Sequence, residues 1–308
     1  MFQSSKVTII GAGLMGCGIA QVFAVKNLQV IIYDPMPEAR ATAKDKIAAN
    51  LSSLKLSHES LEFIQVTGDM QSAISSADFI IEAAPEKLAI KQKIFAEILP
   101  FVEPNTIVAS NTSVIPIVDI FSGLDYQNQV VGTHWWNPPY LVPLVEVVQS
   151  EQSSEHAIAT MMELLAYVGK TPVHIKKDVP GFVGNRMQHA LWREAIALIN
   201  DGVCSPEGID QVVKNSFGLR LPVLGPIENA DLVGLDLTLD IHNVILPSIN
   251  NQQSPADVLK QKVADGKLGM KSGEGFIQWS SEQAQRVRDD LSQYLLNVQN
   301  KKEKQDEI

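Results

Sequence analysis

A glycine-rich turn near the N-terminus constrains the fold of this chain more than any other feature. The turn Gly11-Ala-Gly-Leu-Met-Gly16 follows the apolar stretch Lys6–Ile10, and apolar residues then recur at helical spacing to about Lys26. A second apolar stretch, Gln29–Tyr33, leads directly to Asp34. A strand, a G-x-G-x-x-G turn, a helix and a second strand that ends at an acid together predict a dinucleotide-binding unit.

The same residues indicate which dinucleotide is bound. Glycines allow the backbone to approach a pyrophosphate, and the free amides at the start of the following helix attract its negative charge. Asp34 can accept hydrogen bonds from both hydroxyls of the adenosine ribose and would repel a 2′-phosphate, so NAD is favoured over NADP. We expect the cofactor to contact Gly11, Gly13, Leu14, Met15, Gly16 and Asp34.

The order of the apolar stretches predicts two domains. Strands alternate with helices as far as the strand Thr171–Ile175, which predicts an α/β fold with a Rossmann-type, doubly wound parallel sheet. The composition changes at Asp178-Val-Pro-Gly181, and beyond it helices are expected almost exclusively, beginning with a long one at Phe182–Asp201. We therefore predict an NAD-binding domain at residues 1–179 and an all-α domain at residues 180–308.

A histidine and a glutamate flank a proline-containing turn in the middle of the chain. His134 ends a predicted strand that starts at Gln129, and Glu146 lies in the next strand, Pro143–Val148. If the two strands pair antiparallel about Tyr140, His134 faces Glu146, and such neighbours lie about 5 Å apart at Cβ. The carboxylate could then fix the imidazole tautomer and leave the other ring nitrogen as a base. A buried polar pair that only secures the hairpin would give the same pattern.

Other polar residues lie where predicted strands end, which is where open α/β sheets bind ligands. These candidates are Glu86 and Lys91, Asn111 and Ser113, and Asn185 near the start of the long helix. Each has a structural alternative. Glu86 and Lys91 could form an exposed pair at a helix end, and the small polar side chains could cap helices.

Composition limits the partners. The formal charge of −10 argues against nucleic acid or an anionic membrane as the main partner but allows a small anionic substrate. No signal-peptide pattern and no long apolar run are recognised, so a cytoplasmic protein without a membrane span is expected. Cys17 and Cys204 are isolated thiols without metal-ligand spacing, and no metal site is predicted.

Ordered motifs along nearly the whole chain resemble the 3-hydroxyacyl-CoA dehydrogenase family. The matching segments are Gly11–Gly16, Glu82-Ala-Ala-Pro-Glu86, Ser110-Asn-Thr-Ser113, His134-x-x-Asn137-Pro, Leu144-Val-Glu146, Pro180-Gly-Phe-x-x-Asn185-Arg186 and Lys271-Ser-Gly-Glu-Gly-Phe276. The resemblance implies an NAD-dependent enzyme of fatty acid metabolism whose helical domain forms a homodimer. It also implies that His134 is the general base, that Glu146 orients it, and that Ser113 and Asn185 bind the reacting oxygens. Cofactor contacts are implied for Glu86, Lys91, Asn137 and Lys271.

Two departures from the family pattern leave the substrate open. Members that use CoA usually carry a longer, lysine-rich helical hairpin between the positions of Asp34 and Asp78, and here only Lys44, Lys46 and Lys55 are expected on the helix. Phenylalanines common after the histidine are replaced by Trp135 and Trp136, which could reshape the acyl pocket or pack in the core.

The family-level expectation is a 3-hydroxyacyl-CoA oxidised at its 3-hydroxyl. The alternative is the same chemistry on a free small hydroxy compound, as in branches of the superfamily that act on carnitine, gulonate or a pyridine-derived alcohol. Arg220 could then bind a substrate carboxylate, although a surface arginine would look the same in the sequence. A non-catalytic, crystallin-like NAD-binding protein is a further alternative, and the complete set of polar residues argues against it.

Overall fold

The computed structural model describes residues 2–124 and 129–306, and the chain divides into two compact units. Unit 1 consists of Met1–Arg186 together with Gln293–Ile308, and unit 2 consists of Met187–Ser292. Helix α7 (Gly184–Asn200) begins in unit 1 and continues into unit 2.

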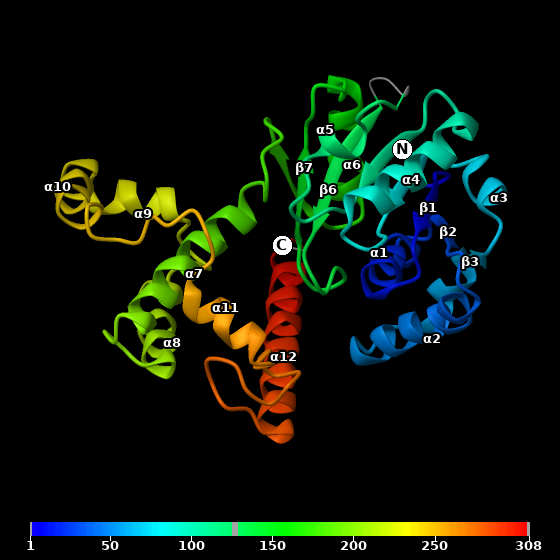
Figure 1. Ribbon diagram of the computed structural model, residues 1–308. Helices are drawn as coiled ribbons and strands as arrows, with labels where there is room; N and C mark the ends of the chain where they lie inside the picture. Colours follow the sequence, from blue (N-terminus) through cyan, green and yellow to red (C-terminus); the bar gives the residue numbers. More distant parts are fainter. Residues whose placement is uncertain (1, 125–128, 307–308) are drawn as a thin grey trace. The chain divides into compact units, whose positions relative to one another are not determined.

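Unit 1 is built on one twisted sheet (Figure 1). Within the described residues its eight strands lie in the order β3-β2-β1-β4-β5-β6-β7-β8. Neighbouring strands are parallel, except that β7 runs antiparallel to β6. The strands are β1 (Lys6–Ile10), β2 (Gln29–Tyr33), β3 (Ile64–Thr67), β4 (Phe79–Glu82), β5 (Ile107–Ser110), β6 (Val130–Trp135), β7 (Leu144–Val148) and β8 (Thr171–Ile175). The predicted doubly wound α/β fold is confirmed.

Helices cover both faces of this sheet, as expected for strands that are apolar on both sides. One core cluster joins the sheet to α1, α2 and α6, and the other joins it to α3, α4 and α5. The helices of unit 1 are α1 (Leu14–Val25), α2 (Pro37–Ser53), α3 (Met70–Ile74), α4 (Leu88–Ile98), α5 (Ile117–Ile120) and α6 (Glu155–Tyr167), with the 3-10 turns η1 (His58–Phe63) and η2 (Leu99–Phe101).

Successive side chains of a strand point to opposite faces of the sheet, so their positions decide which of them lie on the face covered by α3, α4 and α5. In β4 and β5, Ile80 and Val108 pack on that face, so Glu82 and Ser110, two residues further along, point the same way. In β6 and β7, the same rule places His134 and Glu146 on the face of Val130 and Val148. Four polar side chains at neighbouring strand ends therefore share one side of the sheet.

One expected boundary in unit 1 differs from the structure, and one alternative is excluded. Helix α4 begins at Leu88, and Lys91 in its first turn is fully buried, so it does not form an exposed pair with Glu86 at a helix end. Helix α2 ends at Ser53 and Lys55 adopts a φ of 58°, so only Lys44 and Lys46 of the three lysines lie on the helix. The short helices α3 and α5 were not predicted, because four or five residues give no readable helical period.

The described part of unit 2 is helical, which agrees with the expected all-α domain. Beyond α7 it contains α8 (Pro206–Lys214), η3 (Phe217–Leu219), α9 (Pro226–Val233), α10 (Leu235–Ile245), α11 (Asp257–Ala264) and the first part of α12 (Ser281–Asp306). The predicted start of the long helix at Phe182 is wrong. Gly181 and Phe182 have positive φ angles of 75° and 50°, which end the preceding turn, and the ring of Phe182 is buried in the core.

None of the helices in the described residues is both long enough and apolar enough to cross a membrane.

Candidate active site

The glycine turn between β1 and α1 fits a dinucleotide pyrophosphate. Gly11 has a φ of 113°, and a Cβ atom there would lie 2.8 Å from the carbonyl oxygen of Ala83. A Cβ on Gly16 would collide with the carbonyl oxygen of Gly11, so this glycine is required for close packing of the helix on the turn. Apart from its chain neighbours, Gly13 has no residue within 4 Å of the Cβ position, so the turn is open where a phosphate would approach. The first amides of an α-helix have no partner within the helix, so those of α1 are available to bind a phosphate there.

Two residues of this turn differ in exposure. The side chain of Leu14 is 62% exposed, whereas Met15 is half-buried and packs against the core. Both amides belong to the first turn of α1, so the backbone of these residues, more than their side chains, can serve a phosphate.

Asp34 is held in place by two backbone amides. Its Oδ2 accepts a hydrogen bond from the Ala12 amide at 2.8 Å, and its Oδ1 accepts one from the Met36 amide at 2.9 Å. These bonds tie the acid at the end of β2 to the glycine turn and fix its orientation. Each carboxylate oxygen keeps further lone pairs, so the carboxylate can still accept hydrogen bonds from ribose hydroxyls.

His134 and Glu146 face each other across β6 and β7, as predicted. They are direct partners in the antiparallel register, and His134 Nδ1 lies 2.7 Å from Glu146 Oε2. Both side chains are buried, with exposures of 4% and 2%. Because an ionised carboxylate only accepts hydrogen bonds, Nδ1 is the donor, and Nε2 of the neutral ring carries the free lone pair.

Glu146 also receives the start of helix α7. Its Oε1 accepts hydrogen bonds from the amides of Val183 at 2.9 Å and Gly184 at 3.0 Å. Burial alone would raise the pKa of this carboxyl, but the hydrogen bond with His134 and the two backbone amides outweigh it, so the pKa is lowered. The carboxylate therefore stays ionised and supports the histidine. The amides at 183 and 184 could not be recognised from the sequence, because any residue type supplies them.

Two aromatic side chains lie beside the ring of His134. Ring centroids lie 5.3 Å away at Trp136 and 5.6 Å away at Phe182. Trp136 also packs against α7, since a Cβ on Gly184 would lie 2.6 Å from its ring. Trp135, one residue earlier on the strand, points into the opposite core, where its ring lies 5.9 Å from that of Phe23. Of the two indoles, only Trp136 is beside the histidine.

The turn after β5 connects to the start of α7. Asn185 Nδ2 donates to the carbonyl oxygen of Ser113 at 2.9 Å, so these two candidate residues are neighbours. Asn111 Oδ1 accepts a hydrogen bond from the Trp135 amide at 3.0 Å and so ties the turn to β6. Asn137 is exposed, and its peptide bond to Pro138 is cis.

Glu86 organises the same turn from the β4–α4 loop. Its Oε1 accepts hydrogen bonds from Thr112 Oγ1 at 2.7 Å and from the amides of Ser113 at 2.8 Å and Val114 at 3.1 Å. Burial would raise the pKa of this carboxyl, but the Thr112 hydroxyl, the charge of Lys91 and the two amides lower it. Lys91 is fully buried, and its Nζ lies 2.8 Å from Glu82, a residue to which the sequence gave no role.

Two predicted residues belong to unit 2. Lys271 lies in the loop before α12, and Arg220 follows η3, and both side chains are exposed. The cluster around His134 described above consists of residues of unit 1.

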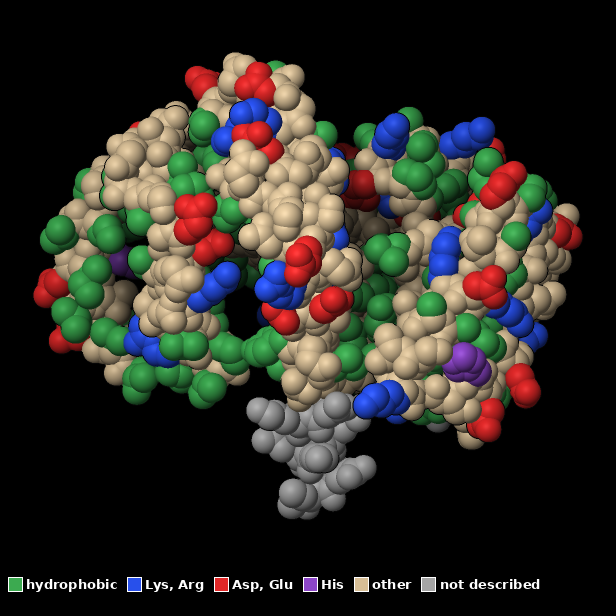
Figure 2. Space-filling view, turned by 90° about the horizontal axis from the view of Figure 1, so that it is seen from below, with side chains coloured by type: hydrophobic (Ala, Val, Ile, Leu, Met, Phe, Trp, Pro, Cys, Tyr) green, Lys and Arg blue, Asp and Glu red, His purple; other side chains and the backbone are tan. Residues whose placement is uncertain are grey.

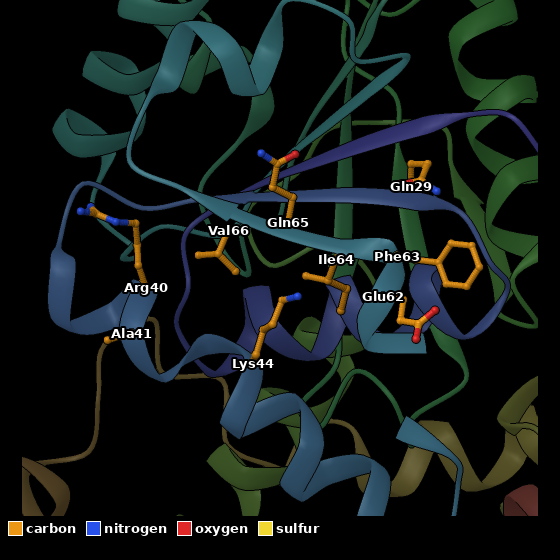
Figure 3. Close-up of a pocket in the computed structure, with 9 residues that line it drawn as sticks. All are labelled: Gln29, Arg40, Ala41, Lys44, Glu62, Phe63, Ile64, Gln65 and Val66. Carbon is orange, nitrogen blue, oxygen red and sulfur yellow. The ribbon is translucent and has the colours of Figure 1, made fainter. Parts of the chain in front are cut away.

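A separate pocket of about 580 Å³ opens beside the edge strand β3 (Figure 3). It is lined from α2 by Arg40 and Lys44 and from the other side by Glu62 and Gln65, together with apolar residues of η1 and β3. None of the residues named above as candidates for catalysis lines this pocket.

A glycine turn that accepts a pyrophosphate, an acid placed for the adenosine ribose and a histidine paired with a carboxylate at the strand ends define an NAD-dependent oxidoreductase of the Rossmann class. Comparison with known families narrows this class. The 3-hydroxyacyl-CoA dehydrogenase NAD-binding domain matches residues 6–179, and the C-terminal domain of the same family matches residues 181–279. The chain belongs to the 3-hydroxyacyl-CoA dehydrogenase family, whose members are NAD-dependent 3-hydroxyacyl-CoA or hydroxy acid dehydrogenases.

Relatives within the family act on different substrates. The chain is 35% identical over 298 residues to 5-formyl-3-hydroxy-2-methylpyridine 4-carboxylate 5-dehydrogenase of Mesorhizobium japonicum, covering 95% of this chain and 96% of that protein. It is 36% identical over 285 residues to a probable 3-hydroxybutyryl-CoA dehydrogenase of Deinococcus radiodurans, covering 89% and 100%. A crystal structure of the pyridine carboxylate dehydrogenase, described as an NAD+-dependent dismutase, superposes with a TM-score of 0.89 at 34% identity, covering 96% and 97%.

Proposed function

We propose that this enzyme transfers a hydride between NAD and the carbon that bears a hydroxyl group on a small carboxylate-bearing compound that is not attached to CoA. His134 is the general base of this reaction. The observation that carries the proposal is the buried His134–Glu146 pair, with Nδ1 and Oε2 2.7 Å apart. It leaves Nε2 able to take the hydroxyl proton, a role worth about 10²–10⁴-fold in rate.

Glu146 supports the histidine in two ways. Its hydrogen bond holds the ring in the tautomer that has a basic Nε2, and its charge stabilises the imidazolium that forms when the proton arrives. The lowered pKa of the Glu146 carboxyl keeps that charge present at neutral pH. Low solvent exposure of both side chains strengthens the interaction, because there is little water to screen it.

The remaining polar residues hold the reactants. Bound NAD supplies the hydride acceptor. The backbone of the glycine turn and Asp34 hold its pyrophosphate and ribose, with Glu86, Lys91 and Lys271 as further cofactor residues from the family resemblance. Ser113 and Asn185 bind the reacting oxygen, and their contact at 2.9 Å supports a joint role. In the reduction direction, the same groups polarise the carbonyl while His134 returns the proton.

The connection between α2 and β3 supports a free substrate over a thioester. Only residues 54–57 separate the end of α2 from η1, so no additional helical hairpin lies between them. The two lysines on α2 are directed at backbone carbonyls, with Lys44 Nζ 3.1 Å from Leu61 O and Lys46 Nζ 3.2 Å from Ala12 O. In place of the lysine-rich surface that contacts CoA in other members, α2 carries Lys44 and Lys46, and both side chains already bind backbone carbonyl oxygens.

Trp136 favours the same choice. Its ring lies beside that of His134 and is braced against Gly184, so it adds bulk next to the base. A flat aromatic wall suits a compact or aromatic substrate such as the pyridine carboxylate used by the relative from Mesorhizobium japonicum.

A 3-hydroxyacyl-CoA is the second candidate substrate. It is favoured by the identity to the probable 3-hydroxybutyryl-CoA dehydrogenase, which spans that relative's full length. The catalytic roles of His134 and Glu146 would be the same for this substrate.

A substrate panel tests the proposal. Purified enzyme and NAD are mixed separately with 3-hydroxybutyryl-CoA, free 3-hydroxybutyrate, carnitine, and hydroxymethyl and formyl pyridine carboxylates. NADH is followed by absorbance, and products are separated by chromatography. Product analysis is needed because a dismutase converts two aldehydes to an acid and an alcohol without net NADH. We expect a free compound to be turned over at least about tenfold faster than the thioester. Preference for the thioester would overturn the substrate assignment.

His134→Ala provides the matched control for catalysis. The variant is expected to lose turnover of every substrate in the panel while it retains the NAD affinity of the wild type. Equal loss of NAD binding would make the histidine structural, and a wild type that binds NAD but turns over nothing would favour a non-catalytic, crystallin-like role.

We also propose that unit 2 pairs with a second copy of this chain. Helices α9 and α10 leave many apolar side chains exposed in the single chain, which is unusual for a stable surface (Figure 2). The most exposed of them on these two helices are Ile227, Leu232, Leu235, Leu239 and Val244. The mass in solution by light scattering is expected to be that of a dimer, and Leu239→Lys is expected to weaken the association. A monomeric wild type would overturn this proposal.

A further inference from the structure

A buried charge network lies at the ends of β4 and β5. Lys91 is fully buried, and its Nζ lies 2.8 Å and 3.0 Å from the two carboxylate oxygens of Glu82, which is also fully buried. Glu86 is the second acid near this ammonium, with its Oε2 at 3.4 Å. One lysine thus lies between two carboxylates at unequal distances.

Glu82 is itself fixed from both sides. The hydroxyl of Ser110, its direct neighbour on β5, donates to Oε2 at 2.5 Å, and the Ala84 amide donates to Oε1 at 2.6 Å. With the two bonds from Lys91, every strong acceptor direction of this carboxylate is used inside the network. Glu82 has no exposed surface, so it does not contact a ligand itself.

The network lies where the cofactor is expected. The strand order places β1 next to β4, with β2 and β3 on one side and β5 and β6 on the other, so the topological switch point lies between β1 and β4. Dinucleotides bind across such a point, and the half of the sheet that starts with β4 holds the second nucleotide. Glu82 is the last residue of β4.

We propose that Glu82 is a positioning residue of the nicotinamide half of the site, acting through Lys91 on Glu86. By holding Lys91, Glu82 keeps the ammonium from drawing Glu86 inward. Glu86 Oε1 then remains on the hydroxyl of Thr112 and on the amides of Ser113 and Val114. This role of Glu82 depends on the proposed function in one respect, which is that Ser113 binds the reacting oxygen.

The distances give this role its physical basis. A buried ammonium requires a carboxylate partner, because an unpaired charge away from water is strongly unfavourable. If Glu82 became neutral, Glu86 would be the remaining carboxylate near Lys91, and closing the 3.4 Å gap would pull its side chain toward the lysine. The three hydrogen bonds to Oε1 would then loosen, and the turn that carries Ser113 would lose its anchor.

The test measures NAD binding and backbone protection, neither of which requires a substrate. Affinity for NAD is measured by calorimetry, and deuterium exchange is measured for the segment Asn111–Ile115. Glu82→Gln is expected to weaken NAD binding about tenfold and to speed exchange in this segment, because the Ser113 and Val114 amides lose their acceptor. NAD affinity and deuterium exchange do not depend on which substrate the enzyme uses. The substrate assignment can therefore be wrong while the role of Glu82 is right, and the reverse.

A second substitution distinguishes positioning from simple structural loss. Adding Lys91→Met to Glu82→Gln removes the ammonium that would pull Glu86, so exchange in the segment Asn111–Ile115 is expected to return to a near wild-type rate. NAD affinity is not the readout for this variant, because Lys91 is itself a proposed cofactor residue. Fast exchange that persists in the double variant would show that Glu82 does not act through Lys91 and would overturn the proposal. Wild-type affinity and exchange in Glu82→Gln itself would also overturn it.

Two further variants serve as controls. Ser110→Ala keeps all three charges and removes one bond to Glu82, so a smaller change in the same direction is expected even if Glu82→Gln does not fold. Thr8→Val removes a buried hydroxyl on β1 that donates to the carbonyl oxygen of Ala73 in α3, outside the network. It is expected to lower the melting temperature without changing NAD affinity or exchange at residues 111–115. If Thr8→Val lost as much NAD affinity as Ser110→Ala, general destabilisation would explain the weaker NAD binding, and the proposal would be overturned.

Discussion

His134 and Glu146 are direct partners across an antiparallel strand pair, and the 2.7 Å hydrogen bond between them is buried. The same carboxylate accepts the first amides of α7 through its other oxygen. One side chain therefore fixes both the histidine and the start of the helix that carries Asn185. A substitution of Glu146 can therefore keep the hydrogen bonds that position α7 while it changes the proton position on His134.

Glu146→Gln is predicted to reduce turnover by about 10²–10⁴-fold. The glutamine oxygen can keep the bonds from Val183 and Gly184, which leaves its NH₂ group facing His134 Nδ1. Nδ1 must then accept, so the proton moves to Nε2 and the ring loses its free base. The measurement is kcat with the best substrate of the panel, together with the NAD affinity, which is expected to stay within about twofold. A variant with nearly normal kcat would show that the carboxylate is only structural.

Acid stability is predicted to depend on Glu86. Its carboxyl pKa lies below the ordinary value of 4.5, so the ionised form stabilises the fold above that value, and this contribution is lost as pH falls through the lowered pKa. Glu86→Gln lacks the contribution, so it is expected to melt below the wild type near neutral pH. The difference in melting temperature should shrink as pH is lowered from about 7 to about 3. A constant difference across this range would mean that the charge of Glu86 does not contribute.

The main fold and the central pair follow from short sequence patterns. The turn at Gly11–Gly16 and Asp34 predicted the first βαβ unit, and the symmetric spacing of His134 and Glu146 about Tyr140 predicted their register, which is confirmed. These predictions succeeded because they depend on local chemistry and on the two-residue period of strands.

Features that depend on packing between distant segments could not be predicted. Glu82 and Lys91 are nine residues apart, and only the placement of α4 on the sheet makes them a buried pair. Trp135 and Trp136 are equivalent as sequence letters, but strand alternation sends one into the core beside Phe23 and the other to His134. The start of α7 was misplaced because Phe182 adopts a positive φ, which is rare for an aromatic residue.

Asp34→Asn is predicted to relax the preference for NAD. The variant loses the negative charge that repels a 2′-phosphate, and the guanidinium of Arg40 is already close, with Nη1 2.8 Å from the carbonyl oxygen of Asp34. The ratio of NADP to NAD dissociation constants, measured by calorimetry, is expected to fall at least about tenfold. Part of this change should be weaker NAD binding, because one of the two backbone amides loses its acceptor. An unchanged ratio would show that residues other than Asp34 discriminate between NAD and NADP.

Two glycines of the same turn are predicted to fail in different ways when changed to alanine. A Cβ on Gly16 would meet the carbonyl oxygen of Gly11, which belongs to the backbone and cannot move aside without shifting the turn. Gly16→Ala is therefore expected to lower stability by about 1–3 kcal/mol and to lose NAD binding as a consequence. A Cβ on Gly13 would have no residue within 4 Å apart from the chain neighbours, and the backbone angles of −75° and −172° suit alanine.

Gly13→Ala is thus expected to keep the melting temperature of the wild type. Its methyl group would occupy space through which a pyrophosphate approaches the amides of α1, so NAD affinity should fall by at least about tenfold. Thermal unfolding and calorimetric titration on both variants separate the two effects. If Gly13→Ala bound NAD normally, the phosphate would not approach over this residue. If both variants lost stability equally, the open space at Gly13 would be needed by the fold itself and not by the cofactor.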